Sequence, residues 1–413
     1  MRVRPTQKGG LAIISQPNPT RIAGRAQALG LILTLNLPLT PLLALGPNLP
    51  QLFRHFAQVP AVDLWVPMIL TAPSICIAVL APVAGALVDR YGRRRTLLVA
   101  VALFSVCGLL PLFLERLPAI LAAQVGAGVG EALIMPAGNT LLGDYFAGEA
   151  RQRWLGVQGI LGALLATAVV LAGGALGTIS WHAPFLMNGL GVVVFIWLLV
   201  AIWEPQATDP RGTGTGREGG ELFPWASLAR VLAVTVPIAV LYFVQAVELG
   251  VIFAHLGAVS SVTISLCTTV ASVGVIIGGW IYRRQRRSRP AVNLAWILSA
   301  YAIGLTGLGL SHQYVYALPF AIVAQFGNGL TVPTLVGWSL QTLQFRYRGR
   351  GMGLWTTAFF CGQFLSPVIL ALLVRVRADF LSAITLIGLA CGVLACVSWV
   401  LTTRRGPPAV AVT

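Results

Sequence analysis

Two acidic side chains, Glu131 and Glu248, lie inside long apolar stretches of the sequence, whereas the other Asp and Glu residues fall in polar segments or at the ends of such stretches. An ionised carboxylate inside a membrane is costly, so it is usually kept where it faces a cavity and binds a proton, an ion or a substrate. We therefore predict that Glu131 and Glu248 handle protons or a cationic substrate, and they are the candidates for proton coupling. The alternatives are a neutral, hydrogen-bonded structural role or a position near the membrane interface.

Other polar and aromatic residues within the apolar stretches are candidates for lining a cavity. On a helix, Gln124 lies on the same face as Glu131, and Tyr242 and Gln245 share a face with Glu248. The further candidates are Asn139, Gln158, Asn328, Trp338 and Gln363. Each alone could instead make an interhelical hydrogen bond, which contributes ~0.6 kcal/mol in a membrane. No arginine or lysine cluster lies within the stretches, so strongly anionic ligands are not expected.

A third chemical feature is the short basic segment GALVDRYGRRR, which runs from Gly85 to Arg95 between two apolar stretches. Its charged and glycine residues are Gly85, Asp89, Arg90, Gly92, Arg93, Arg94 and Arg95. So many charges cannot lie in hydrocarbon, and arginine marks the cytoplasmic side of a membrane. We predict a tight cytoplasmic loop between two membrane helices.

The spacing Gly-x-x-x-Asp-Arg-x-Gly-Arg-Arg resembles the signature loop of the major facilitator superfamily. The resemblance implies that Asp89 meets the start of the eleventh span and that a loop arginine pairs with Asp144, so that the two halves are latched on the cytoplasmic side. Arg153, which aligns with Arg350 in the second half, is assigned to the same inner gate. The alternative is a solvated loop that only sets topology.

Two departures from the drug–proton antiporters of that superfamily matter. Their fourth span carries Arg-x-x-x-Gly-x-Gly, but here Gln124 takes the place of the arginine before Gly128 and Gly130. Their fifth span carries Gly-Pro-x-x-Gly-Gly, of which only the pair Gly173 and Gly174 is present. We infer that proton coupling falls more heavily on Glu131.

Composition defines the class of protein. The 413 residues are 57% hydrophobic and only 10% charged, and the mean hydropathy is +0.83, whereas soluble domains carry about 25% charged residues. This is the composition of a polytopic membrane protein. The net charge of +16 is spread over short loops and does not indicate nucleic-acid binding. The six cysteines lie in apolar segments without metal-binding spacing.

Hydropathy predicts an all-α membrane protein with twelve spans of about 20 residues each. The expected spans are 27–49, 65–88, 96–114, 118–142, 155–177, 184–203, 228–253, 256–281, 291–310, 315–340, 351–374 and 382–402. All but four of the 28 Lys and Arg residues then fall on one side, the exceptions being Arg54, Arg116, Arg375 and Arg377. This asymmetry predicts that both termini are cytoplasmic.

The chain divides into two similar halves. At one constant offset, Pro136 aligns with Pro333 and Gly156 with Gly353, which predicts two six-helix bundles related by a pseudo-two-fold axis along the membrane normal. The expected domains are a cytoplasmic tail over 1–26, a bundle over 27–203, a cytoplasmic linker over 204–227, a bundle over 228–402 and a cytoplasmic tail over 403–413.

These features predict a secondary transporter of a bacterial inner membrane. We expect alternating access and proton-coupled efflux of a small amphipathic or cationic compound; import of a small organic solute is the alternative. The four histidines have no metal-binding spacing and no Walker motif is present, so neither an enzyme nor an ATP-driven pump is expected. We expect no cofactor, the proton gradient as energy source, and a monomer in the bilayer.

Overall fold

The computed structural model describes residues 23–146, 148–205, 225–284, 290–343, 348–377 and 379–404. Within these ranges the side chains of a few residues, including Asp89 and 348–350, are not described. The described chain is helical throughout, with short turns between the helices and no strand.

The first half of the chain begins with a broken helix and continues with long rods. Its elements are α1 (Arg25–Asn36), η1 (Leu37–Leu39), α2 (Thr40–Leu45), η2 (Gly46–Asn48), α3 (Leu49–His55), α4 (Val62–Tyr91), α5 (Arg93–Leu109), η3 (Leu110–Phe113), α6 (Leu117–Tyr145), α7 (Gly148–Gly177), η4 (Ala183–Gly189) and α8 (Leu190–Ala201). The second half contains α9 (Trp225–His255), α10 (Ser261–Ala271), α11 (Val273–Arg284), α12 (Pro290–Leu310), α13 (Tyr314–Thr342), α14 (Arg348–Arg377) and α15 (Phe380–Arg404).

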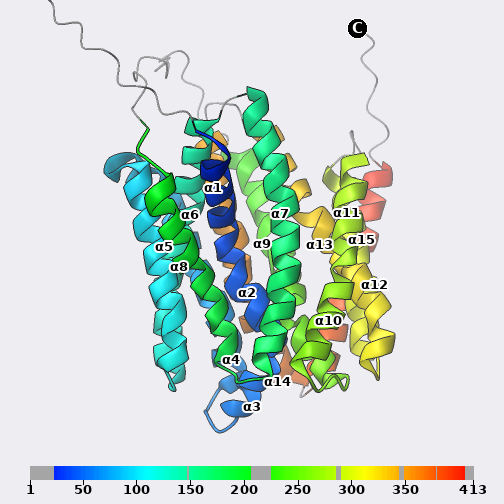
Figure 1. Cartoon of the computed structure of the whole chain (residues 1–413). Coiled ribbons are helices and arrows are strands. Elements are labelled where there is room, and N and C mark those ends of the chain that lie inside the picture. The colour runs from blue at the N-terminus through cyan, green and yellow to red at the C-terminus, as the bar shows by residue number, and fades with distance from the viewer. Residues whose placement is uncertain are drawn as a thin grey trace, which may run out of the picture.

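These helices make twelve crossings of a membrane. In the described chain, 11 helical stretches are long and apolar enough to span a bilayer. α7 is a further rod of 30 residues, of which Leu164–Gly177 is an apolar helix. The two described chain ends lie at the same end of the molecule, as an even number of crossings requires (Figure 1). We call this end the terminus side and the opposite end the far side.

The predicted all-α fold of two six-helix bundles is confirmed, but several boundaries differ. α7 begins at Gly148 rather than at 155, because a helix continues beyond its apolar portion where its charged turns face water. α9 begins at Trp225, inside the expected linker, and α15 reaches Arg404. Ile202, Trp203 and Glu204 make hydrogen bonds to the first bundle, so the part of the chain bound to that bundle reaches into the expected linker at Glu204.

The first crossing is broken into short α and 3₁₀ segments. Pro38, Pro41, Pro47 and Pro50 each stand at the first or second position of a segment. Proline has no N–H group and cannot continue the hydrogen-bond ladder of a helix, so each proline starts a new segment. The crossing therefore bends along its length and follows the surface of the other helices.

Glycines allow the helices of the first bundle to pack closely. A Cβ atom at Gly130 of α6 would lie 2.6 Å from the carbonyl oxygen of Ala100 in α5, and one at Gly128 would lie 2.5 Å from Cα of Pro73 in α4. Such small residues let backbones approach where lipid provides no hydrophobic drive. The two glycines of the fourth-span pattern thus hold α6 against its neighbours.

The two bundles touch at both ends of the molecule. On the terminus-side half, Thr357 Oγ1 of α14 donates to the carbonyl oxygen of Ala78 in α4, at 2.8 Å. Nearer the far side, Gln51 Nε2 donates to Ser261 Oγ at 2.8 Å and so joins α3 to α10. In each contact, one helix belongs to the first bundle and the other to the second. These contacts therefore set how far the bundles are tilted apart.

Candidate functional site

The turn between α4 and α5 is held by a carboxylate from the end of the first bundle. Gly92 has φ +88°, which favours glycine and lets the chain reverse sharply. Glu204 then accepts two hydrogen bonds at the start of α5, from Arg93 N and from Arg94 N, each at 2.8 Å. A carboxylate at this position satisfies free N–H groups and complements the positive end of the helix dipole.

The arginines of the turn tie three helices together. Arg93 Nη1 lies 2.7 Å from Asp144 Oδ2, at the end of α6, and both side chains are partly exposed. Arg94 donates from Nε to the Ile202 carbonyl oxygen at 2.8 Å and from Nη2 to the Leu199 carbonyl oxygen at 3.1 Å. These bonds lie within the first bundle, so they stiffen its terminus-side end.

The other predicted gate residues have different surroundings. Arg90 stands over the ring of Tyr91, with its guanidinium carbon 5.5 Å from the ring centroid. Arg95 and Arg153 are exposed, as is Gly85. The side chain of Asp89 and those of 348–350 lie outside the described residues, so the expected contact between Asp89 and the eleventh span remains a prediction. Glu204 was predicted as the first linker residue, and its contact with the start of α5 was not expected from the sequence.

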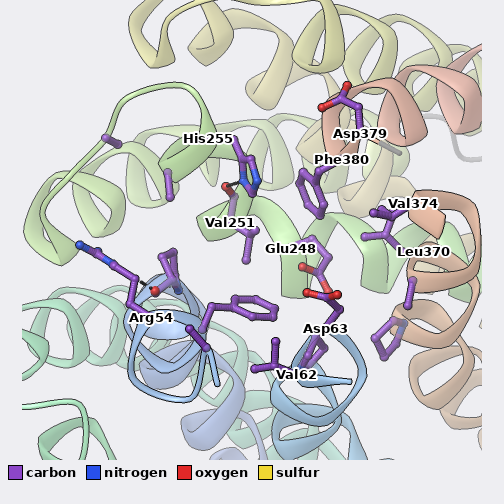
Figure 2. Close-up of a pocket in the computed structure, with 18 of the residues that line it drawn as sticks. Arg54, Val62, Asp63, Glu248, Val251, His255, Leu370, Val374, Asp379 and Phe380 are labelled. Carbon is purple, nitrogen blue, oxygen red and sulfur yellow. Dashed lines mark hydrogen bonds between the residues drawn. The ribbon is translucent and has the colours of Figure 1, made fainter. Parts of the chain in front are cut away.

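A cavity of about 730 Å³ opens between the bundles on the far side. It lies among α3 and α4 of the first bundle and α9, α14 and α15 of the second (Figure 2). Its wall is mainly apolar, with Phe53, Val251, Leu370 and Val374 among the lining residues. Small-molecule sites have this character: a concave, apolar wall with few polar groups.

Glu248 is part of this wall. Its side chain is 2% exposed, and it points from α9 into the cavity (Figure 2). The two residues predicted on its face lie deeper. Gln245 is fully buried, with neither polar side-chain atom bonded among the described residues, and the Tyr242 ring packs on Phe359 with centroids 5.5 Å apart. Of these three residues, only Glu248 lines the far-side cavity.

Glu131 occupies a different place. It is 4% exposed in α6, and its Oε1 has no hydrogen-bond partner in the described part of the chain. Gln124 on the same face is buried with both polar atoms unpaired among the described residues. Neither residue lines the far-side cavity. The structure therefore does not bring the two predicted coupling acids together in one cavity.

The remaining cavity candidates also lie away from the far-side cavity. Asn328 accepts from Tyr301 Oη at 2.6 Å and donates to Gln325 Oε1 at 2.8 Å, so it belongs to a polar network between α12 and α13. Of the other four predicted candidates, Gln363 is buried, Gln158 and Trp338 are partly buried, and Asn139 is exposed. In this conformation Asn328 has the interhelical role that the sequence analysis gave as the alternative.

The cavity wall contains four ionisable residues that the sequence analysis did not select. They are Arg54, Asp63, His255 and Asp379. All four stand at the ends of helices or just outside them, where charged residues ordinarily meet water, so none of them is unusual by itself. Taken together, however, all four fall on the same predicted side of the membrane, at the ends of four different spans, and this shared position could have indicated them.

A second ionisable group lies on the far side of the first bundle. Glu115 has one oxygen 3.4 Å from His182 Nε2 and the other 4.0 Å from His55 Nε2. The ring of Trp181 stacks on His182, with centroids 3.5 Å apart. Burial lowers the pKa of His182, and the nearby Glu115 carboxylate opposes this shift. The group joins the end of α3 to the segment before η4.

Comparison with known proteins identifies the class. The family model described as Major Facilitator Superfamily matches residues 39–367. The chain therefore belongs to the major facilitator superfamily: it is a multi-pass membrane transporter and not an enzyme.

The chain is similar to several bacterial transporters. Multidrug efflux pump LfrA of Mycolicibacterium smegmatis is 26% identical over 283 residues, 66% of this chain and 50% of LfrA. The class B tetracycline resistance protein of Escherichia coli is 28% identical over 205 residues, 49% of this chain and 50% of that protein. The uncharacterized transporter EfpA of Mycobacterium tuberculosis is 29% identical over 170 residues, 41% of this chain and 32% of EfpA. The matches thus span between a third and a half of these relatives' lengths.

Solved structures share the fold. A bacterial homologue of the human lysosomal transporter Spinster, in an inward-facing and unoccupied conformation, has a TM-score of 0.71 at 16% identity, covering 94% of this chain and all of that one. The nucleoside transporter NupG has a TM-score of 0.71 at 10% identity, covering 91% of this chain and 99% of that one. At such identities the likeness concerns the fold alone.

Proposed function

We propose that this protein is a secondary transporter of the bacterial plasma membrane that exports small amphipathic or cationic organic compounds in exchange for protons. The observation that carries the proposal is the apolar far-side cavity with the buried carboxyl of Glu248 in its wall. The similarity to a multidrug efflux pump and to a tetracycline resistance protein supports export.

The orientation follows from the charges. Arg93, Arg94 and Arg95 lie at the terminus-side turn between α4 and α5, and basic loops remain on the cytoplasmic side of a membrane. We assign the terminus side to the cytoplasm, so both described ends are cytoplasmic and the cavity of Figure 2 opens outward.

The proposed cycle is alternating access. In this conformation α4 and α14 close the cytoplasmic side through Thr357 and Ala78, while a proton from outside reaches Glu248 through the cavity. Protonation neutralises that carboxyl and favours rocking of the bundles to open the cytoplasmic side. The proton gradient is the energy source. One chain suffices, because the pathway lies between its own two bundles.

The test is proton movement in proteoliposomes that contain a pH-sensitive dye. A panel of cationic and neutral compounds is added to wild type, to Glu248→Gln, to Glu131→Gln and to the control Asp379→Asn. We expect compound-driven proton movement in wild type and a loss of at least about tenfold in Glu248→Gln, with exchange of the neutral compounds retained, because the amide cannot take up or release the proton that the carboxyl exchanges. Asp379→Asn should behave as wild type.

Three outcomes contradict the proposal in different ways. Substrate movement without a proton signal in any variant makes the protein a facilitator, and proton-driven uptake toward the cytoplasmic side makes it an importer. Loss of coupling in Glu131→Gln with normal coupling in Glu248→Gln moves the proton site to α6. Transport that needs ATP and survives proton uncouplers rejects secondary transport altogether.

A further inference from the structure

The ionisable side chains in the wall of the far-side cavity fall into two groups. The first group makes bonds inside its own bundle. Arg54 Nε donates to the Pro50 carbonyl oxygen at 3.3 Å, and its guanidinium points away from Glu248 (Figure 2). His255 Nδ1 lies 2.9 Å from the Val251 carbonyl oxygen of its own helix. These two side chains already have a polar partner.

Asp379 also belongs to the first group. It precedes α15 and accepts a hydrogen bond from Ser382 N at 2.8 Å, as the capping residue of that helix. Hydrogen bonds from Ser382 hold the pKa of Asp379 below its usual value. Its charge is therefore compensated by the helix that it caps.

Asp63 and Glu248 form the second group. No hydrogen bond or ion pair from the described residues reaches either carboxylate. They come from opposite bundles, Asp63 from the first turn of α4 and Glu248 from α9. Figure 2 shows both carboxyl groups directed into the same part of the cavity, which both residues line. When both acids are ionised their charges repel each other, and a cation between them removes that repulsion.

The surroundings indicate which kind of cation fits. Ca²⁺ takes six to eight oxygen ligands, and the described residues contain no group of three or more acidic, His or Cys side chains that could hold a metal ion. The wall beside the two acids is apolar, with Phe53, Leu370 and Val374. A cation that carries its own apolar body satisfies both features, and aromatic rings such as Phe53 attract cations.

We propose that Asp63 and Glu248 are the two halves of one subsite for an organic monocation, with the charge between the carboxylates and the apolar body against the wall of the cavity. This inference rests on the proposed function and deepens it, because it names the substrate class and a pair of residues that hold it. Since each bundle supplies one carboxylate, the bound cation draws the far-side ends of the bundles together. A proton on Glu248 removes half of the subsite and releases the cation outward.

The experiment is equilibrium binding of radiolabelled tetraphenylphosphonium to purified protein in detergent, without any gradient. The variants are Asp63→Asn, Glu248→Gln and the control Asp379→Asn, which changes a third acid of the same wall that is already engaged. Neutral triphenylphosphine oxide is the competitor that reports on the apolar wall alone. Because Glu248 is buried and its variant could fail to fold, the exposed Asp63 provides an independent test.

We expect Asp63→Asn and Glu248→Gln each to weaken tetraphenylphosphonium binding at least tenfold, with Asp379→Asn and the competition by triphenylphosphine oxide unchanged. Three results would contradict the subsite. They are wild-type affinity for tetraphenylphosphonium in Asp63→Asn, an equal loss of affinity in Asp379→Asn, and displacement of bound tetraphenylphosphonium by millimolar Mg²⁺. If binding depends on both acids but no proton movement is seen in liposomes, the subsite is supported and the proposed proton-coupled export is wrong. If export is proton-coupled but Asp63→Asn binds tetraphenylphosphonium normally, the proposed function is supported and the subsite is wrong.

Discussion

At the scale of single residues, two buried acids of similar sequence context have different surroundings. Glu248 borders the far-side cavity, whereas Glu131 lies within α6 away from it. A buried, unpaired carboxyl oxygen is costly, and Glu131 Oε1 has no partner among the described residues. In this conformation Glu131 does not line the far-side cavity, and its role in proton coupling stays a prediction.

A prediction at this scale concerns His182. Burial lowers its pKa below the ordinary 6.5, so below about pH 6.5 the unfolded chain binds a proton more readily than the folded protein, and stability falls as the pH falls. We expect the melting temperature to decrease between pH 7.5 and 5.5, and His182→Gln to reduce that decrease by about 1–2 °C. Thermal unfolding in detergent measures it, with the exposed His312→Gln as control. An unchanged pH dependence in His182→Gln contradicts this assignment.

At the scale of elements, the start of α5 depends on a residue far along the chain. Glu204 follows the last crossing of the first bundle, yet its two oxygens accept from the first two N–H groups of α5. This contact and that of Arg94 with Ile202 lock the α4–α5 turn to the end of α8. The basic loop therefore has a structural anchor in addition to any role in topology.

The anchor predicts a graded effect on stability. Glu204→Ala removes both hydrogen-bond acceptors and should cost about 1 kcal/mol, the usual cost of losing a helix cap. Glu204→Gln keeps one acceptor oxygen and should cost about half as much. Thermal unfolding of the two variants beside wild type measures the series. Equal stability of Glu204→Ala and wild type would show that solvent replaces the carboxylate without cost.

At the scale of the whole molecule, the conformation is defined by which side of the bundle interface is closed. α4 and α14 meet on the terminus-side half, where a Cβ atom at Gly353 would lie 4.0 Å from the Ala81 carbonyl oxygen. The cavity occupies the far-side half of the same interface. Opening the terminus side requires α4 and α14 to separate, so this contact and the cavity should alternate.

A cross-link tests this relation. In a cysteine-free background, Ala81→Cys and Gly353→Cys are joined with a short bifunctional thiol reagent. We expect transport to fall to background, because the bundles can no longer rock, while tetraphenylphosphonium still binds from the far side. The single variants treated with the same reagent are the controls. Full transport in the cross-linked protein would mean that α4 and α14 do not separate during the cycle.

The sequence by itself determined the all-α fold of two membrane-spanning bundles and picked out Glu131 and Glu248 as acids within apolar spans. The reason is that hydrocarbon strongly excludes charge. Apolar stretches, basic loops and acids within the spans, such as Glu131 and Glu248, can therefore be recognised from short segments of sequence. Only the tertiary structure decided which of these residues share a space. Rotation of each helix and tilt of each bundle placed Glu248 with Asp63 across the far-side cavity, left Glu131 elsewhere, and brought Glu204 to α5. Those placements depend on close packing between segments far apart in the chain, for which no local pattern exists.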